Sequence, residues 1–437
     1  MDSWGLAAIA GVLLTYAGLS RALERTPVSG AIFFLSAGLI VGNEGLGWIG
    51  FGPKSEQVRL LAELTLTLVL FADASRIDVS ALRREYTVPA RLLGIGLPLT
   101  ILAGWALGAG MFGSLSGAEV LVLAVILAPT DAALGQAVVT DPRLPSRIRQ
   151  GLNVESGLND GICVPLLFIA LAIAEAEAGT ESAHGALVLV VDAIGYGVLF
   201  GAIAGIVGAL VTRLALLHEL MDSAWSQVVP LATAALAYGL AVPLGGSGFI
   251  AAFVAGFVFG AWHRDTEGET TYLLEEVGGL ASGVTFIVFG AAVVGPVLAL
   301  LTWKEALYGL LSLTVVRMAP VAVSLLGTHA RWRTVAFVGW FGPRGLASIV
   351  FMVIVLEDGD LSHVSGITAA VVFTIVLSVY AHGLSAPALT DRYARWYRAH
   401  PHDRLPPMER VHAASHRWRH PKATVRSQQT PAPATDE

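Results

Sequence analysis

The chain has 437 residues, of which 55% are hydrophobic and only 14% are charged. A soluble globular protein carries about a quarter charged residues, so this composition excludes an ordinary soluble domain. The formal net charge of -6 says little about partners, because the placement of the charges matters more than their sum. The single cysteine, Cys163, excludes an intramolecular disulfide and a cysteine-based metal cluster.

Apolar runs long enough to cross a bilayer recur from Trp4 to Leu389 and predict an all-α polytopic membrane protein. The thirteen predicted spans cover residues 4–20, 28–42, 58–75, 89–113, 117–139, 147–175, 187–215, 226–242, 245–262, 276–300, 303–327, 334–356 and 366–390. The first span lacks the basic start and cleavage site of a signal peptide, so we expect a retained helix. The ninth, GSGFIAAFVAGFVFGAW, has small residues at helical spacing and should pack closely against a partner helix.

The distribution of Lys and Arg predicts the orientation. Before the C-terminal tail, thirteen of them lie in the odd-numbered connections, whereas only Lys54, Arg59 and Lys304 lie in the even-numbered ones. We therefore expect the odd connections and the C-terminus in the cytoplasm, and the N-terminus outside. Residues 1–390 are predicted to form the transmembrane domain, and residues 391–437 a basic, disordered cytoplasmic tail.

Two spans are interrupted by Pro and Gly, the fifth at residues 129–131 (PTD) and the twelfth at residues 342–345 (GPRG). If the first six and the last six spans are repeats of inverted topology, the breaks occupy equivalent positions, which is typical of a transporter's binding site. Each break exposes the partial charges of half-helix ends. Asp131 and Arg344 have the signs suited to neutralise such ends.

The sixth span carries a polar stripe on an otherwise apolar helix, consisting of Glu155, Ser156, Asn159 and Asp160. Residues four apart stack along one helix face, so Glu155 aligns with Asn159 and Ser156 with Asp160. Oxygen ligands of this kind suit a hard monovalent cation such as Na⁺. With the break included, the expected Na⁺ ligands are Asp160, Asp131, Ser156 and Thr130.

The same stripe suggests how a proton is coupled to the cation. Burial in a membrane disfavours the charged form of a carboxylate, so Asp160 is predicted to hold either a proton or a cation near physiological pH. Such competition, combined with alternating access, is an exchange mechanism. Glu155 needs another role, because two free carboxylates so close together would repel. Intramembrane charges cost at least about 2.5 kcal/mol each, so we expect Glu155 to pair with the buried Arg317, with Arg344 as the less favoured partner.

Other readings of the sequence leave more unexplained. A channel needs a continuous polar pore, whereas the polar residues here cluster near the midplane. An intramembrane serine protease needs a Ser and a His, which Ser247 (in GGSG) and His382 supply, but it gives the buried acids and Arg residues no role. Asp73 and Asp78 are interpreted as caps of a helix end near a basic cytoplasmic loop.

Three motifs resemble one known family: PTDAA at residues 129–133, LNVESGLNDG at residues 152–161 and GPRG at residues 342–345. They resemble the monovalent cation–proton antiporters of the NhaP and eukaryotic NHE type, over roughly residues 1–390. The resemblance implies the NhaA/NhaP-like antiporter fold, with two inverted-topology repeats and crossing broken helices, and a homodimer. It implies that Asp160 is the residue that binds the ion and the proton. Further family residues correspond to Thr130, Asp131, Glu155, Ser156, Arg317 and Arg344. Asn159, in place of a second Asp, resembles the electroneutral branch.

The sequence therefore predicts a secondary transporter rather than an enzyme, which exchanges Na⁺ or Li⁺ for H⁺ and serves pH homeostasis. K⁺/H⁺ exchange is the alternative within the same family. We expect a location in the lipid bilayer of the inner (plasma) membrane. No cofactor and no nucleic-acid partner are expected.

Overall fold

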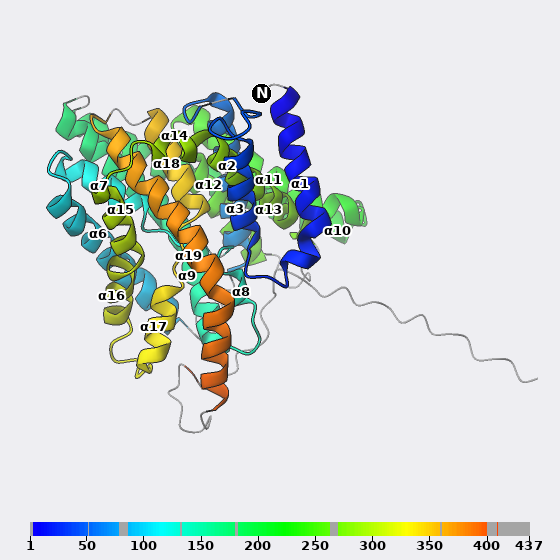
Figure 1. The fold of residues 1–437 in the computed structure, drawn as a ribbon. Helices are drawn as coiled ribbons and strands as arrows, with labels where there is room; N and C mark the ends of the chain where they lie inside the picture. The colour runs from blue at the N-terminus through cyan, green and yellow to red at the C-terminus, as the bar shows by residue number, and fades with distance from the viewer. Residues whose placement is uncertain are drawn as a thin grey trace, which may run out of the picture.

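The computed structural model describes residues 3–50, 52–77, 86–131, 133–179, 182–262, 270–358, 361–399 and 409, and these form helices and connecting turns without a strand (Figure 1). The helices of the first half are α1 (Ser3–Leu23), α2 (Gly30–Val41), α3 (Glu56–Ser75), α5 (Thr87–Arg91), η1 (Leu92–Gly96), α6 (Leu97–Met111), α7 (Gly117–Ile126), α8 (Gln136–Val139), α9 (Ser146–Ala178) and α10 (Ala183–Leu217). Those of the second half are α11 (Ser223–Ala241), η2 (Val242–Leu244), α12 (Gly248–Trp262), α13 (Tyr272–Val288), η3 (Phe289–Val294), α14 (Gly295–Leu298), α15 (Trp303–Leu313), α16 (Val315–Ser324), α17 (Trp332–Trp340), α18 (Leu346–Asp358) and α19 (Val364–Arg398).

Each predicted span corresponds to one helix or to consecutive helix segments, within the part of the chain that the structure describes. Eight of the described helices are long and apolar enough to cross a membrane. The two spans predicted to be broken are each divided in two, into α7 with α8 and α17 with α18. The all-α polytopic architecture is thus confirmed.

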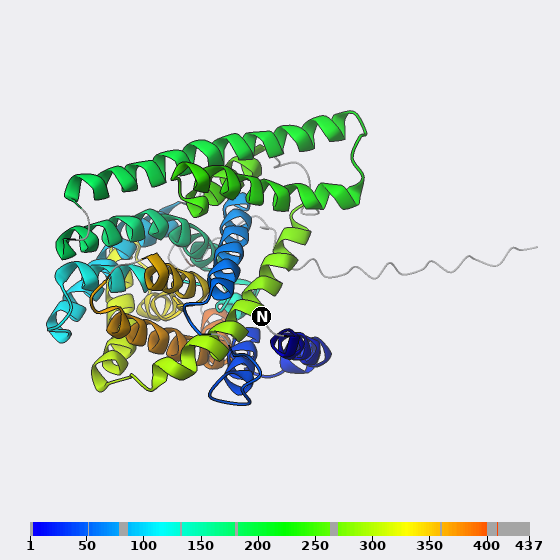
Figure 2. The same ribbon diagram turned by 90° about the horizontal axis from the view of Figure 1, so that it is seen from above.

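The helices pack as two groups, seen from one end of the bundle in Figure 2. One group contains α5 to α9 and α15 to α19, and the other contains α1 to α3 and α10 to α14. In the second group, α10 runs along one edge beside α11 and α12, while α1 stands apart at a corner (Figure 2). These outer helices expose large apolar side chains such as Leu14 on α1 and Leu187 on α10, which suits contact with lipid.

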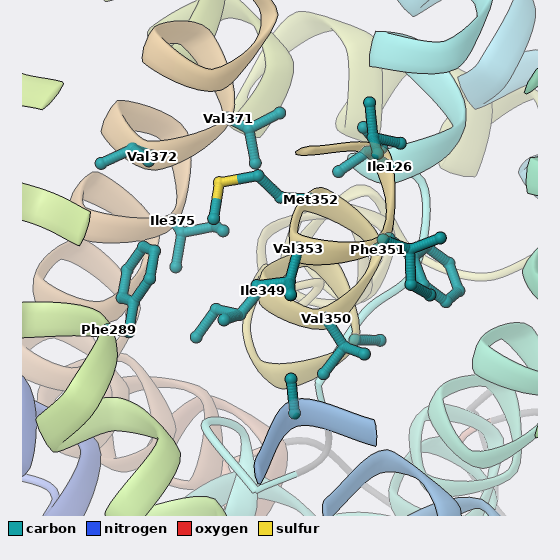
Figure 3. Close-up of a cluster of buried hydrophobic side chains, with 14 of the residues drawn as sticks. Ile126, Phe289, Ile349, Val350, Phe351, Met352, Val353, Val371, Val372 and Ile375 are labelled. Atoms are coloured by element: carbon teal, nitrogen blue, oxygen red, sulfur yellow. The ribbon is translucent and has the colours of Figure 1, made fainter. Parts of the chain in front are cut away.

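Helix α18 of the first group is apolar on all sides, and it packs against α3 and α13 of the second group as well as against α7, α9 and α19 of its own. Figure 3 shows its side chains pointing in different directions into the neighbouring helices. The residues of this cluster include Ile349, Val350, Phe351, Met352 and Val353 on α18, packed with Ile126, Phe289, Val371, Val372 and Ile375. Because α18 is held on every side, the break at its N-terminus lies deep in the protein.

Helix α12 packs closely against two neighbours, as its small residues predicted. A Cβ added to Gly256 would overlap the backbone of Phe71 on α3. On the other side, a Cβ added to Gly201 of α10 would overlap the backbone of Ala251 on α12. Glycine therefore allows these backbones to approach, which is how membrane helices without a strong hydrophobic drive associate.

The last helix extends beyond the predicted end of the transmembrane domain. α19 continues to Arg398, so Asp391, the predicted start of the tail, lies inside a helix. Tyr393 and Tyr397 are buried along this extension. The two tyrosines are four residues apart, a spacing that indicates a helix, although the Arg-rich composition of the segment suggested a disordered tail. The rest of the predicted tail lies outside the described residues, except for Glu409.

Candidate functional site

The two broken spans cross at their breaks. The backbone N–H of Asp131, in the first break, donates a 2.8 Å hydrogen bond to the carbonyl of Pro343 in the second. The hydroxyl of Ser348, near the start of α18, donates to the carbonyl of Ile126 at the end of α7 over 2.7 Å. Irregular backbone is tolerated at membrane depth only where protein groups satisfy it, and here the two repeats satisfy each other.

Asp131 bonds both to the turn that follows its own break and to the helix that follows the other break. Its Oδ1 accepts the backbone N–H groups of Ala133 and Leu134, at 2.7 and 3.4 Å. Its Oδ2 accepts the N–H of Leu346, the first residue of α18, at 2.9 Å. A carboxylate at a helix N-terminus is stabilised by the helix dipole. Gly345 allows this contact, because a Cβ there would overlap the Asp131 carboxylate.

Arg344 has the complementary position at the end of α7. Its side chain is completely buried, and Nη1 donates to the carbonyls of Ala128 and Pro129 at 3.0 and 3.1 Å. Its backbone N–H donates to Ser378 Oγ on α19 at 2.6 Å. A cation near a helix C-terminus is favoured in the same way as an anion near an N-terminus. Each of the two charges therefore lies on a half-helix end of the other repeat.

Helix α9 presents its polar stripe to the first break. Ser156 Oγ donates to the carbonyl of Thr130, and Asn159 Nδ2 donates to Thr130 Oγ1 over 2.7 Å. Both stripe residues are buried, so these bonds form away from water. The structure thus brings the predicted neutral ligands together around Thr130.

Glu155 and Arg317 form a buried ion pair with two parallel hydrogen bonds. Nη1 and Nη2 of Arg317 lie 2.5 and 2.9 Å from the two carboxylate oxygens of Glu155. The two side chains are only 3% and 2% exposed. Arg317 also lies against the second break, because a Cβ on Gly342 would overlap its guanidinium group. The charge of Glu155 is therefore balanced within the protein, and Arg317 rather than Arg344 balances it.

Asp160 has different surroundings from the other acids of the site. It is buried, and its Oδ1 has no hydrogen-bond partner among the described residues. No described Lys, Arg or His forms an ion pair with it. Within the same residues, no group of three or more His, Cys, Asp or Glu side chains is arranged to hold a metal ion.

A small cavity of about 10 Å³ lies beside the first break. Thr130, Asp131 and Ser156 line it together with apolar residues that include Leu152 and Phe341. This volume is close to the minimum of about 10 to 15 Å³ that one water molecule needs. Three of the four predicted Na⁺ ligands therefore share one small cavity, whereas Asp160 is not part of its lining.

Asp73 lies closer to the site than the sequence indicated. It was predicted to cap a helix end, but a Cβ added to Gly157 of α9 would lie 3.4 Å from the Asp73 Cβ. Gly157 is one helical turn before Asp160, so Asp73 approaches the stripe from α3. Arg76 lies 3.8 Å from the Asp73 carboxylate. An acid at the end of an apolar run is the sequence signal that could have indicated this position of Asp73. The second predicted cap, Asp78, lies outside the described residues.

The serine and histidine of the protease alternative have separate partners. Ser247 Oγ accepts the N–H of Ile250 in the first turn of α12, at 3.3 Å. His382 Nε2 lies 2.9 Å from the carbonyl of Trp340, the last residue of α17, and its ring packs against that indole. His382 therefore supports the second break, a role that the sequence did not reveal.

Three comparisons with known proteins agree with this geometry. The family described as "Sodium/hydrogen exchanger, transmembrane" matches residues 9–392. The chain is 27% identical over 388 residues to the K⁺/H⁺ antiporter NhaP2 of Shewanella oneidensis, covering 86% of this chain and 65% of that protein. It is 24% identical over 308 residues to a probable Na⁺/H⁺ antiporter of Schizosaccharomyces pombe, covering 66% of this chain and 40% of that protein. The chain thus spans less than two thirds of the length of these curated relatives.

A solved structure shows the same fold. The sodium proton antiporter MjNhaP1 of Methanocaldococcus jannaschii superposes with a TM-score of 0.69, at 20% identity, over 90% of this chain and 98% of that one. At this identity the likeness concerns the fold, which is the NhaP antiporter fold that the motifs predicted. The family match, in contrast, covers nearly the whole membrane domain, and it includes both helix breaks and the stripe of α9. The chain belongs to the sodium/hydrogen exchanger family.

Proposed function

We propose that the protein is a secondary antiporter that exchanges Na⁺ (and Li⁺) for H⁺ across the membrane. The observation that carries this proposal is the contrast among three acids at one site. Glu155 is neutralised by Arg317, and both oxygens of Asp131 accept backbone N–H bonds. Of these three acids, only Asp160 has a buried carboxylate oxygen without a hydrogen-bond partner among the described residues. A buried carboxylate in that state requires a proton or a cation.

In the proposed mechanism the two ions compete for Asp160. Protonated Asp160 is neutral and remains stable in the apolar interior; the deprotonated form attracts a dehydrated monovalent cation. Ser156, one helical turn before Asp160 on α9, and Thr130, which bonds to Ser156, supply neutral oxygens, and Asp131 contributes negative charge at the crossing. Movement of the first helix group (α5 to α9 with α15 to α19) past the second then exposes the site to the other side of the membrane. Because one monovalent cation is exchanged for one proton at a single carboxylate, no net charge crosses the membrane and the exchange is electroneutral.

K⁺ is the second candidate ion, since the NhaP2 relative in Shewanella oneidensis carries the name of a K⁺/H⁺ antiporter. The relative in Schizosaccharomyces pombe is named as a probable Na⁺/H⁺ antiporter, and MjNhaP1 as a sodium proton antiporter. We propose Na⁺ as the primary ion because the matching family is described as sodium/hydrogen exchangers and MjNhaP1 is named as a sodium proton antiporter.

The test is an exchange assay in proteoliposomes with an imposed pH gradient. Addition of Na⁺ or Li⁺ should dissipate the gradient in the wild type, and K⁺ should do so more weakly. Dissipation by K⁺ alone would replace Na⁺ with K⁺ in the proposal. Asp160→Asn should abolish the response to every cation while the protein still purifies as a folded species.

Asp192→Asn is the matched control for this variant. Asp192 is another intramembrane acid, on the outer helix α10, and the same chemical change there should leave exchange at the wild-type level. Normal exchange by Asp160→Asn, or equal losses in both variants, would contradict the assignment of Asp160.

Three further proposals concern the setting of the transporter. The bias of Lys and Arg supports an external N-terminus and a cytoplasmic C-terminus in the plasma membrane. The exposed apolar surface of α1 and α10 supplies the area that a homodimer would bury in part. We also propose that the transmembrane domain comprises residues 1–390 together with the extension of α19, followed by a cytoplasmic tail.

A further inference from the structure

A second cavity, far larger than the one at the site, opens where α17 begins and α19 ends. It has a volume of about 410 Å³ and is lined by Arg331, Trp332, Arg333 and Trp396. Figure 1 shows the α17 and α19 ends together at the lower end of the bundle, away from the crossing. The guanidinium groups of Arg331 and Arg333 each lie 5.7 Å from the ring of Trp396, and Arg333 lies 5.5 Å from that of Trp332. Two cations are therefore held over aromatic faces around an open space.

Within the part of the chain that the structure describes, these two cations have no acidic partner. Neither Arg331 nor Arg333 forms an ion pair with any residue that the structure describes. The nearby carboxylate of Glu409 accepts instead the backbone N–H of Arg331 and the hydroxyl of Thr334, at 3.0 and 2.7 Å. Aromatic faces hold a guanidinium group in place but do not neutralise it. The cavity therefore presents two positioned positive charges suited to an anion, and the planar guanidinium fork matches a phosphate in particular.

The surface beside the cavity is apolar and exposed. Trp332 is 74% exposed and Leu326, in the loop that leads to it, is 67% exposed. Val323, at the end of α16, continues this exposed apolar surface toward the middle of the bundle. Trp side chains prefer the membrane–water boundary, where one end of the ring is apolar and the other is wet. A ligand that fits both parts has a phosphate head and an apolar tail.

We propose that this cavity binds the phosphate headgroup of an anionic phospholipid, whose acyl chains lie along Val323 and Leu326. The phosphate lies between Arg331 and Arg333, and the indoles of Trp332 and Trp396 flank the glycerol region. Since α17 leads directly into the second helix break, a bound lipid stabilises the N-terminal end of that half-helix. The proposal does not depend on which cation is exchanged.

The test measures lipid binding to the purified full-length protein in detergent by native mass spectrometry. Phosphatidylglycerol should bind the wild type more tightly than phosphatidylcholine. Each basic residue near an anionic lipid surface contributes about 1 kcal/mol, or about fivefold in affinity. Arg331→Gln combined with Arg333→Gln should therefore weaken phosphatidylglycerol binding about 30-fold and leave phosphatidylcholine binding unchanged. Arg333→Gln alone, at an exposed side chain, should weaken it about fivefold.

The matched control replaces two exposed arginines at the C-terminal end of α1, Arg21→Gln with Arg25→Gln; α1 ends on the lower side of the bundle in Figure 1. This control should bind phosphatidylglycerol like the wild type. An unchanged lipid preference in the Arg331 and Arg333 variants, or an equal loss in the control, would overturn the proposal. Inorganic phosphate is added as a competitor in a separate arm. Displacement of the lipid by low concentrations of phosphate would mean that the site takes free phosphate instead of lipid.

Discussion

The two helix breaks resemble each other in backbone but differ in what surrounds them. The second break lies among buried charges, with Arg344 inside it and the Arg317–Glu155 pair against it. The first break carries Asp131, which is only half-buried and whose carboxylate accepts backbone N–H bonds. Arg344 donates to its carbonyls, Ser156 and Asn159 add neutral hydrogen bonds, and a small cavity opens beside it. Similar elements in two inverted repeats have thus acquired unequal surroundings.

This difference indicates a division of work between the breaks. Stranding a buried charge is more costly than losing a neutral hydrogen bond. Substitutions at the second break should therefore act mainly on folding. Substitutions at the first break should leave the protein folded and act mainly on the exchanged ions. The following predictions test this division, from the largest expected effect to the smallest.

Removal of one partner of the buried pair should have the largest effect on stability. Arg317→Met leaves Glu155 charged and unpaired in the interior, and we expect a loss of about 3 to 5 kcal/mol in the free energy of unfolding. The double variant with Glu155→Met removes both charges and should recover most of this loss, because well-packed apolar residues often replace a buried ion pair without cost. Denaturant titration of the detergent-purified variants measures both values. A double variant as unstable as Arg317→Met would show that the pair has more than a structural role.

Replacement of Arg344 should come second. Arg344→Met leaves the carbonyls of Ala128 and Pro129 without their shared donor, so we expect a loss of about 2 to 3 kcal/mol, since each buried unsatisfied group costs about 1 to 3 kcal/mol. Arg213→Met, at an exposed position on α10, is the control and should change stability little. The same denaturant titration applies, and equal effects of the two substitutions would remove the argument for a buried charge at the second break.

Asp131→Asn should have the smallest effect on folding. Asn retains one acceptor oxygen, so one of the bonds to Ala133 or Leu346 persists, and a lost helix cap costs about 1 kcal/mol. Removal of the negative charge should still raise the cation concentration needed for half-maximal exchange in proteoliposomes. A stability loss as large as that of Arg344→Met would make the two breaks equivalent, contrary to the comparison.

Much of the architecture could be predicted because the membrane limits the possible solutions. A backbone in lipid must satisfy its own polar groups, so apolar length alone locates the spans. The breaks followed from Pro129 and Pro343, which interrupt otherwise apolar runs. The partner of Glu155 followed from the rule that buried charges pair, and Arg317 was one of two candidates.

What could not be predicted depends on which helices pass close to each other. Nothing near Asp131 in the sequence indicates that it contacts Leu346, because that contact arises only from the crossing of distant segments. The approach of Asp73 to α9 is another case: its position at the end of α3 beside Arg76 follows from the chain, whereas its closeness to Gly157 arises only from the packing of α3 on α9. The sequence suggests His382 only as a partner of Ser247 in a protease site, whereas its contact with the end of α17 depends on the three-dimensional packing.

The most direct test of the central claim is proton release on cation binding. The purified protein is placed in weakly buffered detergent solution near neutral pH, and the pH change is recorded as Na⁺ is added. Because a cation can bind only a deprotonated ligand, we expect close to one proton released per bound cation at a pH where Asp160 is mostly protonated, and none from Asp160→Asn. Cation binding to the wild type without proton release, or undiminished release from Asp160→Asn, would contradict competition at this carboxylate.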